Sequence, residues 1–573
     1  MMAGRLRHVF VLLAHSLLGA CAMVPAAVPV AAPHSYARGV VSAADPRAAE
    51  AGAAMLRQGG SATDAAIATM LALTVVEPQS SGIGGGGFLV EAAADGTVET
   101  WDGRETAPAA ATPEWFIGSD GKPVPFPQAV KSGLSIGVPG NLRLAAEAHQ
   151  RHGKLGWAAL FRPAITLAEK GFAVTPRLHD SLASAQDRAA LSPAGAALFY
   201  DAAGQPLPTG TVIRNRDLAH TLRRIAKEGP DSFYTGDMAD GLAQIVAGYT
   251  PVANHMVAAD LATYQAKPRN ALCGQYRQYR ICGMGPPSSG ATTVYAILKQ
   301  LERFDLHALG PQSVTSWHLF AESQRLAYAD RDAYLGDTDF VSVPVAGLMA
   351  GDYLAARGTQ IDPARRMATV QPGIPVGIAQ AGPQGLGPVE QGTTHFAIVD
   401  REGAVASYTS TVEGPFGSGL MIGGFFLNNE LTDFSFVPAR DGRPVANRVQ
   451  GGKRPRSSMA PTVVFGPDGK AVLVIGAAGG ATIPVQVAKA LIGVLDFGLS
   501  AQEAIALPGL FDPDGTIMLE PNSPLLVMKP QLEALGHAVV VRPMPFKANA
   551  VQHTPGGWTG AADPRSEGAA VSE

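Results

Sequence analysis

The sequence predicts a layered α/β fold, and three observations support that prediction. Helical patterns dominate between about Pro139 and Leu242, and a further helix is expected over roughly Val314–Tyr334. From Thr393 onward, strand patterns follow one another closely, and a single long helix, about Ile483–Leu495, interrupts them. Strands with helices on both sides indicate a layered core whose sheet comes largely from the second part of the chain.

The first elements of the folded body have clear start signals. Asp45 is placed to cap a helix that ends near Arg57. The Ser61–Asp64 capping box begins a second, apolar helix that ends near Val76. Residues 88–98 alternate around an Asp-Gly turn, which predicts paired strands. Later strands are expected at 395–400, 404–411, 425–427, 462–465 and 471–475.

Composition excludes several classes of partner and cofactor. The 573 residues are 46% hydrophobic and 16% charged, which is enough to bury a large core with more than one cooperative unit. A formal charge of -4, with both signs scattered, gives no basic surface for nucleic acid. None of the common metal or nucleotide motifs occurs among the 13 histidines and three cysteines, so we expect no metal and no cofactor.

The N-terminus resembles an export signal, which we assign to residues 1–35. Arg5 and Arg7 precede an apolar run from Val9 to Ala20 that is too short to anchor the chain across a bilayer. Two kinds of cleavage stay open: a lipoprotein-type cut that leaves Cys21 lipidated, or an ordinary cut after an alanine within 26–32. An uncleaved helix is a third interpretation. Export places the protein in the periplasm, with or without a lipid anchor, or outside the cell.

The two remaining cysteines lie in a hairpin pattern. A two-residue turn at Arg277-Gln278 sets Cys273 directly opposite Cys282. In an oxidising compartment the pair is able to form a cross-strand disulfide. Two reduced, partly buried thiols are the alternative, because hairpin register is easily shifted by one residue.

Two short motifs resemble functional sites but lack the required context. The glycine-rich stretch 82–87 has dinucleotide-binding spacing, yet Glu77-Pro78 interrupts the approach and a strand pattern follows instead of a helix. We expect a tight wall beside a substrate or another strand. Ser135 fits the serine-hydrolase elbow pattern, but a poor strand precedes it and Pro139-Gly140 follows too closely.

The hairpin that begins at Thr393 has a predictable register. If Arg401–Gly403 forms a three-residue turn, Asp400 faces Ala404 and Thr393 faces Thr411, within one residue if a bulge intervenes. A threonine hydroxyl is a weak nucleophile, but its own α-amine becomes a base once the preceding peptide bond is cut. Taken alone, a Gly-Thr pair at the head of a strand reflects ordinary β-propensity.

Several segments occur together in a characteristic order. In the second part of the chain they are 392–395 (Gly-Thr-Thr-His), 427–434 (Leu-Asn-Asn-Glu-Leu-Thr-Asp-Phe), 453–461 (Lys-Arg-Pro-Arg-Ser-Ser-Met-Ala-Pro) and 476–480 (Gly-Ala-Ala-Gly-Gly). These closely resemble the small subunit of the gamma-glutamyltransferases. Segments 77–78, 81–88, 102–108, 138–140 and 286–290 resemble the large subunit. The resemblance extends from about residue 40 to residue 565.

This resemblance implies a fold, a processing event and a substrate. The family has the four-layer αββα sandwich of N-terminal-nucleophile hydrolases, formed jointly by two subunits of one autocleaved precursor. The implied cut lies between Gly392 and Thr393, giving a large subunit of residues 36–392 and a small one of residues 393–573 that pair as a heterodimer. The implied substrate is a gamma-glutamyl compound such as glutathione, and the acyl group passes to water or to an amino acid or peptide.

Family positions also imply site residues. Thr393 is the nucleophile, with Thr411 beside it. Backbone N–H groups of Gly479 and Gly480 are expected to hold the oxyanion. The substrate carboxylate is assigned to Arg104 with Ser457 and Ser458, and the substrate ammonium to Asp433 with Glu413 and Glu430.

Two departures from the family pattern leave the substrate open. Many members have Asn and Gln where this chain has Glu413 and Glu430, and the 434–452 connection is shorter than a lid-bearing one. Glutaryl or cephalosporin-type acylase activity is therefore one alternative. A periplasmic binding protein that never cleaves itself is another.

Overall fold

The computed structural model of the protein describes residues 39–383 and 392–573, and two stacked β-sheets form its core. The expected leader and Cys21 lie outside the described residues. Across the first sheet the strands are β22 (Ala569–Ser572), β1 (Val40–Ala43), β9 (Gly392–Val399), β10 (Val405–Glu413), β2 (Gly86–Ala92), β3 (Val98–Gly103) and β6 (Lys267–Arg269). Across the second they are β21 (Gly557–Ala562), β20 (Lys547–Thr554), β16 (Ala471–Ala478), β15 (Thr462–Phe465), β8 (Tyr279–Gly283) and β7 (Leu272–Tyr276).

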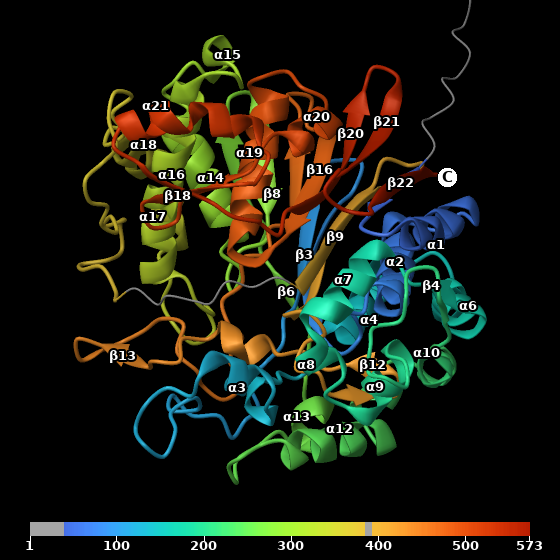
Figure 1. The fold of residues 1–573 in the computed structure, drawn as a ribbon. Helices are drawn as coiled ribbons and strands as arrows, with labels where there is room; N and C mark the ends of the chain where they lie inside the picture. Colours follow the sequence, from blue (N-terminus) through green and yellow to red (C-terminus); the bar gives the residue numbers. More distant parts are fainter. Residues whose placement is uncertain (1–38, 384–391) are drawn as a thin grey trace, which may run out of the picture. The chain divides into compact units, whose positions relative to one another are not determined.

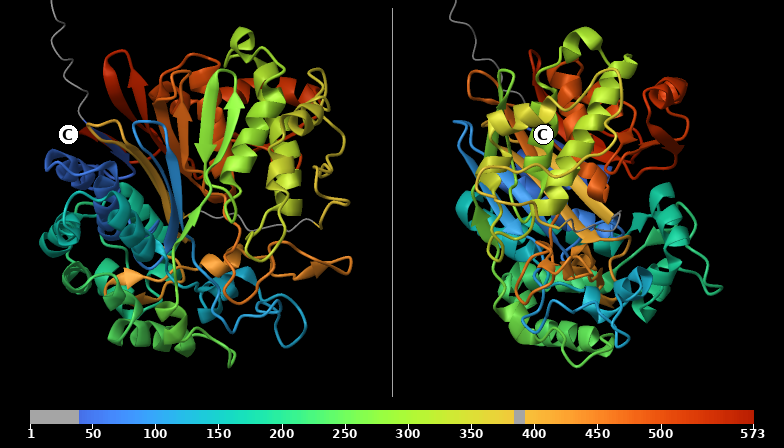
Figure 2. Two further views of the ribbon diagram at one scale, coloured as in Figure 1. Left: turned by 180° about the vertical axis from the view of Figure 1, so that it is seen from behind. Right: turned by 90° about the vertical axis from the view of Figure 1, so that its left-hand side faces the viewer.

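Helices cover the outer face of each sheet and complete four layers (Figure 1). The first sheet is covered by α1 (Pro46–Arg57), α2 (Ala62–Val76) and α4 (Asn141–His152). The second is covered by α14 (Gly290–Leu301) and α19 (Ile483–Leu495), with α16 (Val314–Tyr334) packed on α14. The view from behind shows the same order of layers (Figure 2). The αββα arrangement confirms the expected fold class, and residues of both proposed subunits build each sheet.

The local signals in the sequence have identifiable structural consequences. Asp45 caps α1, and Ser61 with Asp64 forms the capping box of α2. Every residue of α2 is buried, because the helix is enclosed by the sheet on one side and by neighbouring helices on the others. β16 extends three residues beyond its expected end at Ile475, since β20 pairs with it as far as Ala478.

The remaining elements surround this core. The helices are α3 (Phe126–Val130), α5 (Trp157–Leu160), α6 (Arg162–Lys170), α7 (Pro176–Ser184), α8 (Gln186–Ala189), α9 (Pro193–Phe199), α10 (Arg216–Glu228), α11 (Asp231–Tyr234), α12 (Asp237–Gly248), α13 (Ala258–Ala262), α15 (Leu306–Leu309), α17 (Val345–Leu348), α18 (Gly351–Gly358), α20 (Ala501–Ala506) and α21 (Lys529–Ala534). A small sheet contains β17 (Leu510–Phe511), β18 (Thr516–Leu519) and β19 (Ala538–Val541). Three two-stranded pairs are β4 (Phe172–Ala173) with β5 (Val212–Ile213), β11 (Met421–Ile422) with β12 (Phe425–Phe426), and β13 (Ala439–Arg440) with β14 (Arg443–Pro444). Within 39–383 and 392–573, no helix combines the length and apolar character needed to cross a membrane.

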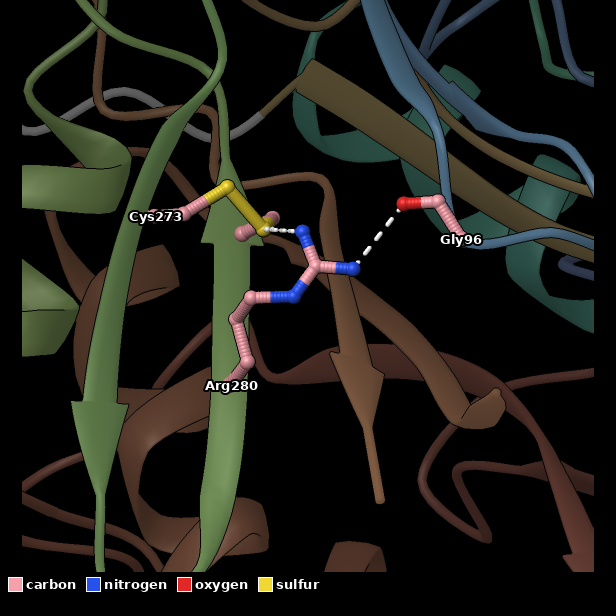
Figure 3. The surroundings of a disulfide bond; sticks show 4 residues. Gly96, Cys273 and Arg280 are labelled. Atoms are coloured by element: carbon pink, nitrogen blue, oxygen red, sulfur yellow. Dashed lines mark hydrogen bonds between the residues drawn. A yellow bond between two sulfur atoms is a disulfide. The ribbon is translucent and has the colours of Figure 1, made fainter. Parts of the chain in front are cut away.

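A disulfide joins the two strands of the β7–β8 hairpin (Figure 3). Cys273 and Cys282 face each other in the register that the sequence predicts, so of the two alternatives the paired one is observed. Arg280 lies beside the disulfide and donates a 2.9 Å hydrogen bond from Nη2 to the carbonyl oxygen of Gly96 on the β2–β3 turn. The hairpin is therefore fastened both across its own strands and to the first sheet.

Reducing this disulfide should destabilise the fold. The bond closes a short loop, and opening it should lower the free energy of unfolding by about 2–3 kcal/mol. Thermal melts with and without dithiothreitol would measure the difference, with thiol labelling to verify reduction. The double variant Cys273→Ala/Cys282→Ala is the control, because its melting temperature should not respond to reductant. Equal melting temperatures for oxidised and reduced wild type would contradict this prediction.

Candidate active site

Thr393 is the second residue of β9, and its hydroxyl lies in a chain of hydrogen bonds. It faces Thr411 across the β9–β10 ladder, with a register shift just beyond this pair, which confirms the predicted register. Thr393 Oγ1 donates to Thr411 Oγ1 at 3.3 Å, and Thr411 Oγ1 donates to the carbonyl oxygen of Gly392 at 2.7 Å. The backbone N–H of Glu413 donates to the same Thr411 oxygen at 2.7 Å. The hydroxyl next to the Gly392–Thr393 bond is thus linked to the carbonyl of that same bond.

The glycine-rich stretch before β2 lets Thr411 sit this close to its neighbours. A Cβ added to Gly85 would lie 2.0 Å from the carbonyl oxygen of Thr411, so only glycine fits there. The expected wall beside another strand is confirmed. Ser135, by contrast, is buried in a short 3₁₀ turn and donates to the carbonyl of Val130, as expected for a serine that is no nucleophile.

His395 lies two residues along β9 on the same face as Thr393. Its ring packs against Gly476 of β16, and its Nδ1 is 2.9 Å from Thr409 Oγ1. Complete burial lowers the pKa of His395 to about 3, so the ring is neutral at physiological pH. This histidine therefore supports the layer between the sheets and is not suited to act as a base near neutral pH.

The end of β16 reaches the same end of the sheets as Thr393. Ser407 Oγ donates to Ile475 O at 3.2 Å, and His395 contacts Gly476, so β16 runs toward the start of β9. Gly479 and Gly480 follow β16 with φ of 124° and 58°, which favours glycine at both positions. The turn leads directly into α19, whose N-terminal end is the positive end of its dipole.

Arg104 pairs directly with two of the predicted ammonium-site acids. Its two terminal nitrogens bind Glu430 and Asp433, and all three residues are buried. Nε and Nη2 also donate to the carbonyl oxygens of Pro455 and Arg456, each at 3.2 Å. The structure thus brings the arginine assigned to the carboxylate subsite and two acids assigned to the ammonium subsite into one charge cluster. The physical reason is that a buried guanidinium needs partners of opposite charge.

Two further carboxyl groups complete the charge cluster. Burial, followed by repulsion from Asp433, raises the pKa of Glu413 to about 8, although Asn429 donates to its carboxylate. Burial likewise raises the pKa of Glu105 to about 7, despite nearby Arg104. Near neutral pH these two groups are therefore able to carry protons.

Ser457 and Ser458 follow the carbonyls that bind Arg104, so they lie beside the charge cluster. Ser457 Oγ accepts from Met459 N at 3.1 Å, and Ser458 Oγ accepts from Arg331 Nη2 at 2.6 Å. Arg331 belongs to α16, and sequence reasoning did not identify it. Its only sequence signal is that this long helix has polar residues on every side instead of a single polar face.

A buried ion pair also borders the site. Lys547 Nζ is 2.6 Å from Glu77 Oε1, and Lys547 pairs with Ala478 in the β16–β20 ladder, one residue before Gly479. Glu77 follows the last residue of α2, so the pair joins the first helix layer to β20, the strand that pairs with β16 next to the glycine turn. Lys547 is the second residue near the site that sequence reasoning missed.

Comparisons with known proteins identify the fold from a solved structure and the family from a family model. The fold is that of N-terminal-nucleophile hydrolases: the crystal structure of cephalosporin acylase from Bacillus halodurans matches with a TM-score of 0.82 and 26% identity, covering 96% of this chain and 99% of that chain. The family model for gamma-glutamyltranspeptidase matches residues 48–572. The chain therefore belongs to the gamma-glutamyltranspeptidase family.

Curated relatives match along nearly their whole length. The glutathione hydrolase proenzyme of Bacillus subtilis (strain 168) is 37% identical over 548 residues, which is 93% of this chain and 91% of the relative. The glutathione hydrolase proenzyme of Escherichia coli (strain K12) is 34% identical over 585 residues, 97% of each chain.

Removing the Thr411 hydroxyl should slow both chain scission and turnover. In Thr411→Val the methyl groups keep the volume, but the Gly392 carbonyl and the Glu413 amide lose their shared partner. We expect the rate of each process to fall about 10- to 100-fold, the usual effect of one well-placed hydrogen bond. Densitometry of the processing time course and steady-state assays would measure this. Thr411→Ser keeps the hydroxyl and should stay within a few-fold of wild type, and equal losses in both variants would contradict the assignment.

Proposed function

We propose that this chain cuts itself between Gly392 and Thr393 and then hydrolyses or transfers the gamma-glutamyl group of glutathione and related compounds. The observation that carries the proposal is the hydrogen-bonded chain from the Thr393 hydroxyl through Thr411 to the carbonyl oxygen of Gly392. Family membership and the match to two glutathione hydrolase proenzymes support the same activity.

Scission begins with the Thr393 hydroxyl. Its oxygen attacks the carbonyl carbon of Gly392, whose oxygen the Thr411 hydroxyl polarises. The hydroxyl proton moves to the departing peptide nitrogen, the C–N bond breaks, and an ester joins Gly392 to the Thr393 side chain. Water then hydrolyses the ester, which frees the Gly392 carboxylate and leaves Thr393 with both a hydroxyl and an α-amine.

Turnover uses the same hydroxyl with the new amine as its base. The amine has an ordinary pKa of about 7.7–8.0, so a large fraction is neutral near pH 8. Thr393 Oγ1 attacks the gamma-glutamyl carbonyl, and N–H groups of Gly479 and Gly480 stabilise the oxyanion. The leaving amine takes the proton, and a gamma-glutamyl ester forms on Thr393. Water or an acceptor amine then attacks the ester and restores the hydroxyl.

The charge cluster fixes the amino-acid head of the donor. A donor ammonium is attracted to Asp433, Glu430 and Glu413, and its carboxylate to Arg104. When the donor binds, its carboxylate pairs with Arg104 and its ammonium pairs with the acids. These contacts replace the ion pairs that Arg104 makes with the acids in the absence of donor. The hydroxyls of Ser457 and Ser458 lie beside this position and complete the carboxylate subsite.

The mature protein consists of two subunits and lies outside the cytoplasm. Residues 36–392 form the large subunit and residues 393–573 the small one, and the two stay together as a heterodimer because both sheets contain strands from each. The chain is exported through its leader, to the periplasm or beyond. Of the two expected leader cleavages, the lipoprotein-type cut would leave Cys21 as a lipidated first residue.

A denaturing gel tests the proposal directly. Purified protein should give two bands of about 37 and 19 kDa, in proportion to the 59.2 kDa of the 573-residue chain, and should release p-nitroaniline from L-gamma-glutamyl-p-nitroanilide. A single intact chain would instead support a binding protein on this scaffold. Two bands without release of p-nitroaniline would separate self-cleavage from the proposed substrate.

A second candidate keeps the nucleophile but changes the acyl group. The observation that favours it is the 0.82 TM-score to the cephalosporin acylase, together with the short 434–452 connection. A glutaryl side chain has no ammonium, so it makes no use of the acids around Asp433. Faster turnover of glutaryl-p-nitroanilide than of the gamma-glutamyl compound would select this candidate.

Donor affinity should depend on pH through Glu413. Because its pKa is raised to about 8, the carboxyl group is protonated at pH 6.5 and becomes an anion above pH 8, where it attracts the donor ammonium. In Glu413→Gln this gain is lost, so the ratio of variant to wild-type KM should rise from near 1 at pH 6.5 to about 5 at pH 8.5. Comparing the two proteins at each pH cancels the titration of the Thr393 amine. A ratio that stays constant with pH would contradict the assignment.

A further inference from the structure

The guanidinium of Arg331 lies behind the two serines of the proposed carboxylate subsite. Its Nη2 donates to Ser458 Oγ at 2.6 Å, and its Nε donates to Ser289 Oγ at 2.9 Å. Ser289 in turn donates from Oγ to the carbonyl oxygen of Ser457 at 2.8 Å. Arg331 therefore holds the Ser458 side chain directly and the Ser457 carbonyl through Ser289.

Arg331 is itself held in one orientation. Its Nη1 donates to Asp332 Oδ1 at 2.7 Å, and its guanidinium lies 5.5 Å from the centre of the Tyr328 ring. The hydroxyl of Tyr328 donates to the carbonyl oxygen of Ala481, in the turn that follows Gly479 and Gly480. The same stretch of α16 thus contacts both the serine segment and the glycine turn.

The direction of the hydrogen bond decides what Ser458 is able to do. A hydroxyl has one proton and two lone pairs, and Arg331 occupies a lone pair of Ser458. Within residues 39–383 and 392–573, the Ser458 proton has no acceptor from the protein. A hydroxyl whose oxygen binds a cation is also a stronger donor toward an anion. The Ser458 hydroxyl therefore keeps its proton for an acceptor on a ligand.

We infer that Arg331 is a positioning residue for donor specificity, which orients and polarises the Ser458 hydroxyl toward the α-carboxylate of a gamma-glutamyl donor. This inference rests on the proposed function. Arg331 adds the selectivity that Arg104 alone does not supply, because Arg104 is shared with Glu430 and Asp433. The substrate class is an acyl donor that keeps its α-carboxylate, as opposed to one from which that group is missing.

The experiment compares two donors that differ only in this group. L-gamma-glutamyl-p-nitroanilide has the α-carboxylate, and 4-aminobutyryl-p-nitroanilide lacks it but keeps the amine. In Arg331→Gln the KM for the first donor should rise about 10- to 100-fold, the effect expected for losing a charge-assisted hydrogen bond, with kcat nearly unchanged. The kcat/KM for the second donor should change less than about 3-fold.

Three further variants separate positioning from a structural role. Ser458→Ala should raise the KM for the gamma-glutamyl donor to a similar extent. The double variant Arg331→Gln/Ser458→Ala should have a KM no higher than the higher of the two single-variant values, because both substitutions remove the same interaction. Arg331→Lys keeps the positive charge but not the guanidinium group that binds two hydroxyls at once, so it should restore part of the affinity for the gamma-glutamyl donor. Arg325→Gln is the matched control: Arg325 is also buried on α16 but pairs with Glu322 and the carbonyl of Met367, and its loss should leave the donor ratio unchanged.

Each outcome decides the inference. Equal losses on both donors, additive effects in the double variant, or failure of both Arg331 variants to mature would overturn it in favour of a structural role. Wild-type protein that is inactive on the gamma-glutamyl donor would instead refute the proposed function. An active wild type with donor-independent Arg331 effects would refute only the positioning role.

Discussion

Thr393→Ala should yield a single intact chain with no measurable acyl transfer. The substitution removes the hydroxyl that is proposed to attack the carbonyl carbon of Gly392, and without scission the α-amine that serves as base never forms. Loss of both nucleophile and base should lower kcat by at least about 10⁴-fold. A denaturing gel over several days and a p-nitroaniline assay would measure the two effects.

Thr393→Ser is the matched control for this variant. It keeps a hydroxyl in the same backbone position, so it should cut itself and retain activity, more slowly than wild type because the serine side chain is less restricted in rotamer. Slow scission of Thr393→Ala at the same bond would show that another group attacks Gly392. Full activity of an uncut Thr393→Ala chain would show that neither the Thr393 hydroxyl nor its free α-amine is needed for turnover.

Asp433→Asn should separate the two candidate substrates. The carboxylate binds Arg104 in the structure and is proposed to bind the donor ammonium, so neutralising it should lower kcat/KM for the gamma-glutamyl donor about 100-fold or more. Glutaryl-p-nitroanilide has no ammonium, and its kcat/KM should change by only a few-fold. Steady-state kinetics with both donors would show the difference.

Glu430→Gln is the control for the charge cluster. In this variant Arg104 keeps Asp433 as its partner, so we expect a loss well below that of Asp433→Asn. The ammonium assignment would be wrong if Asp433→Asn lowered kcat/KM equally for both donors. Thermal melts of both variants would identify a loss of folding, since breaking a buried ion pair is destabilising.

Much of the fold was predictable because its signals are local. The α16 and α19 helices cover the same residues that their patterns predict, and the Thr393–Thr411 register follows from counting back from a three-residue turn. The Cys273–Cys282 pairing depends on a two-residue turn in the same way. Each of these features is set by residues fewer than about 25 positions apart, within reach of helix and hairpin rules.

The sequence did not indicate the contacts between site residues that are distant in the chain. Arg104 and Glu430 are separated by 326 residues, and no local pattern indicates that they pair. Arg331 and Ser458 are 127 residues apart, and an arginine on a long helix is usually a solvated residue. The burial that makes these contacts strong is a tertiary property, so the sequence alone did not identify them.

N-terminal sequencing of the smaller mature fragment identifies the bond at which the chain is cut. A free amine beside the Thr393 hydroxyl exists only if the backbone is cut at that point. We expect the fragment to begin Thr-Thr-His-Phe-Ala-Ile, starting at Thr393. An active protein whose chain is unbroken there, or whose smaller fragment starts at another residue, would contradict this expectation.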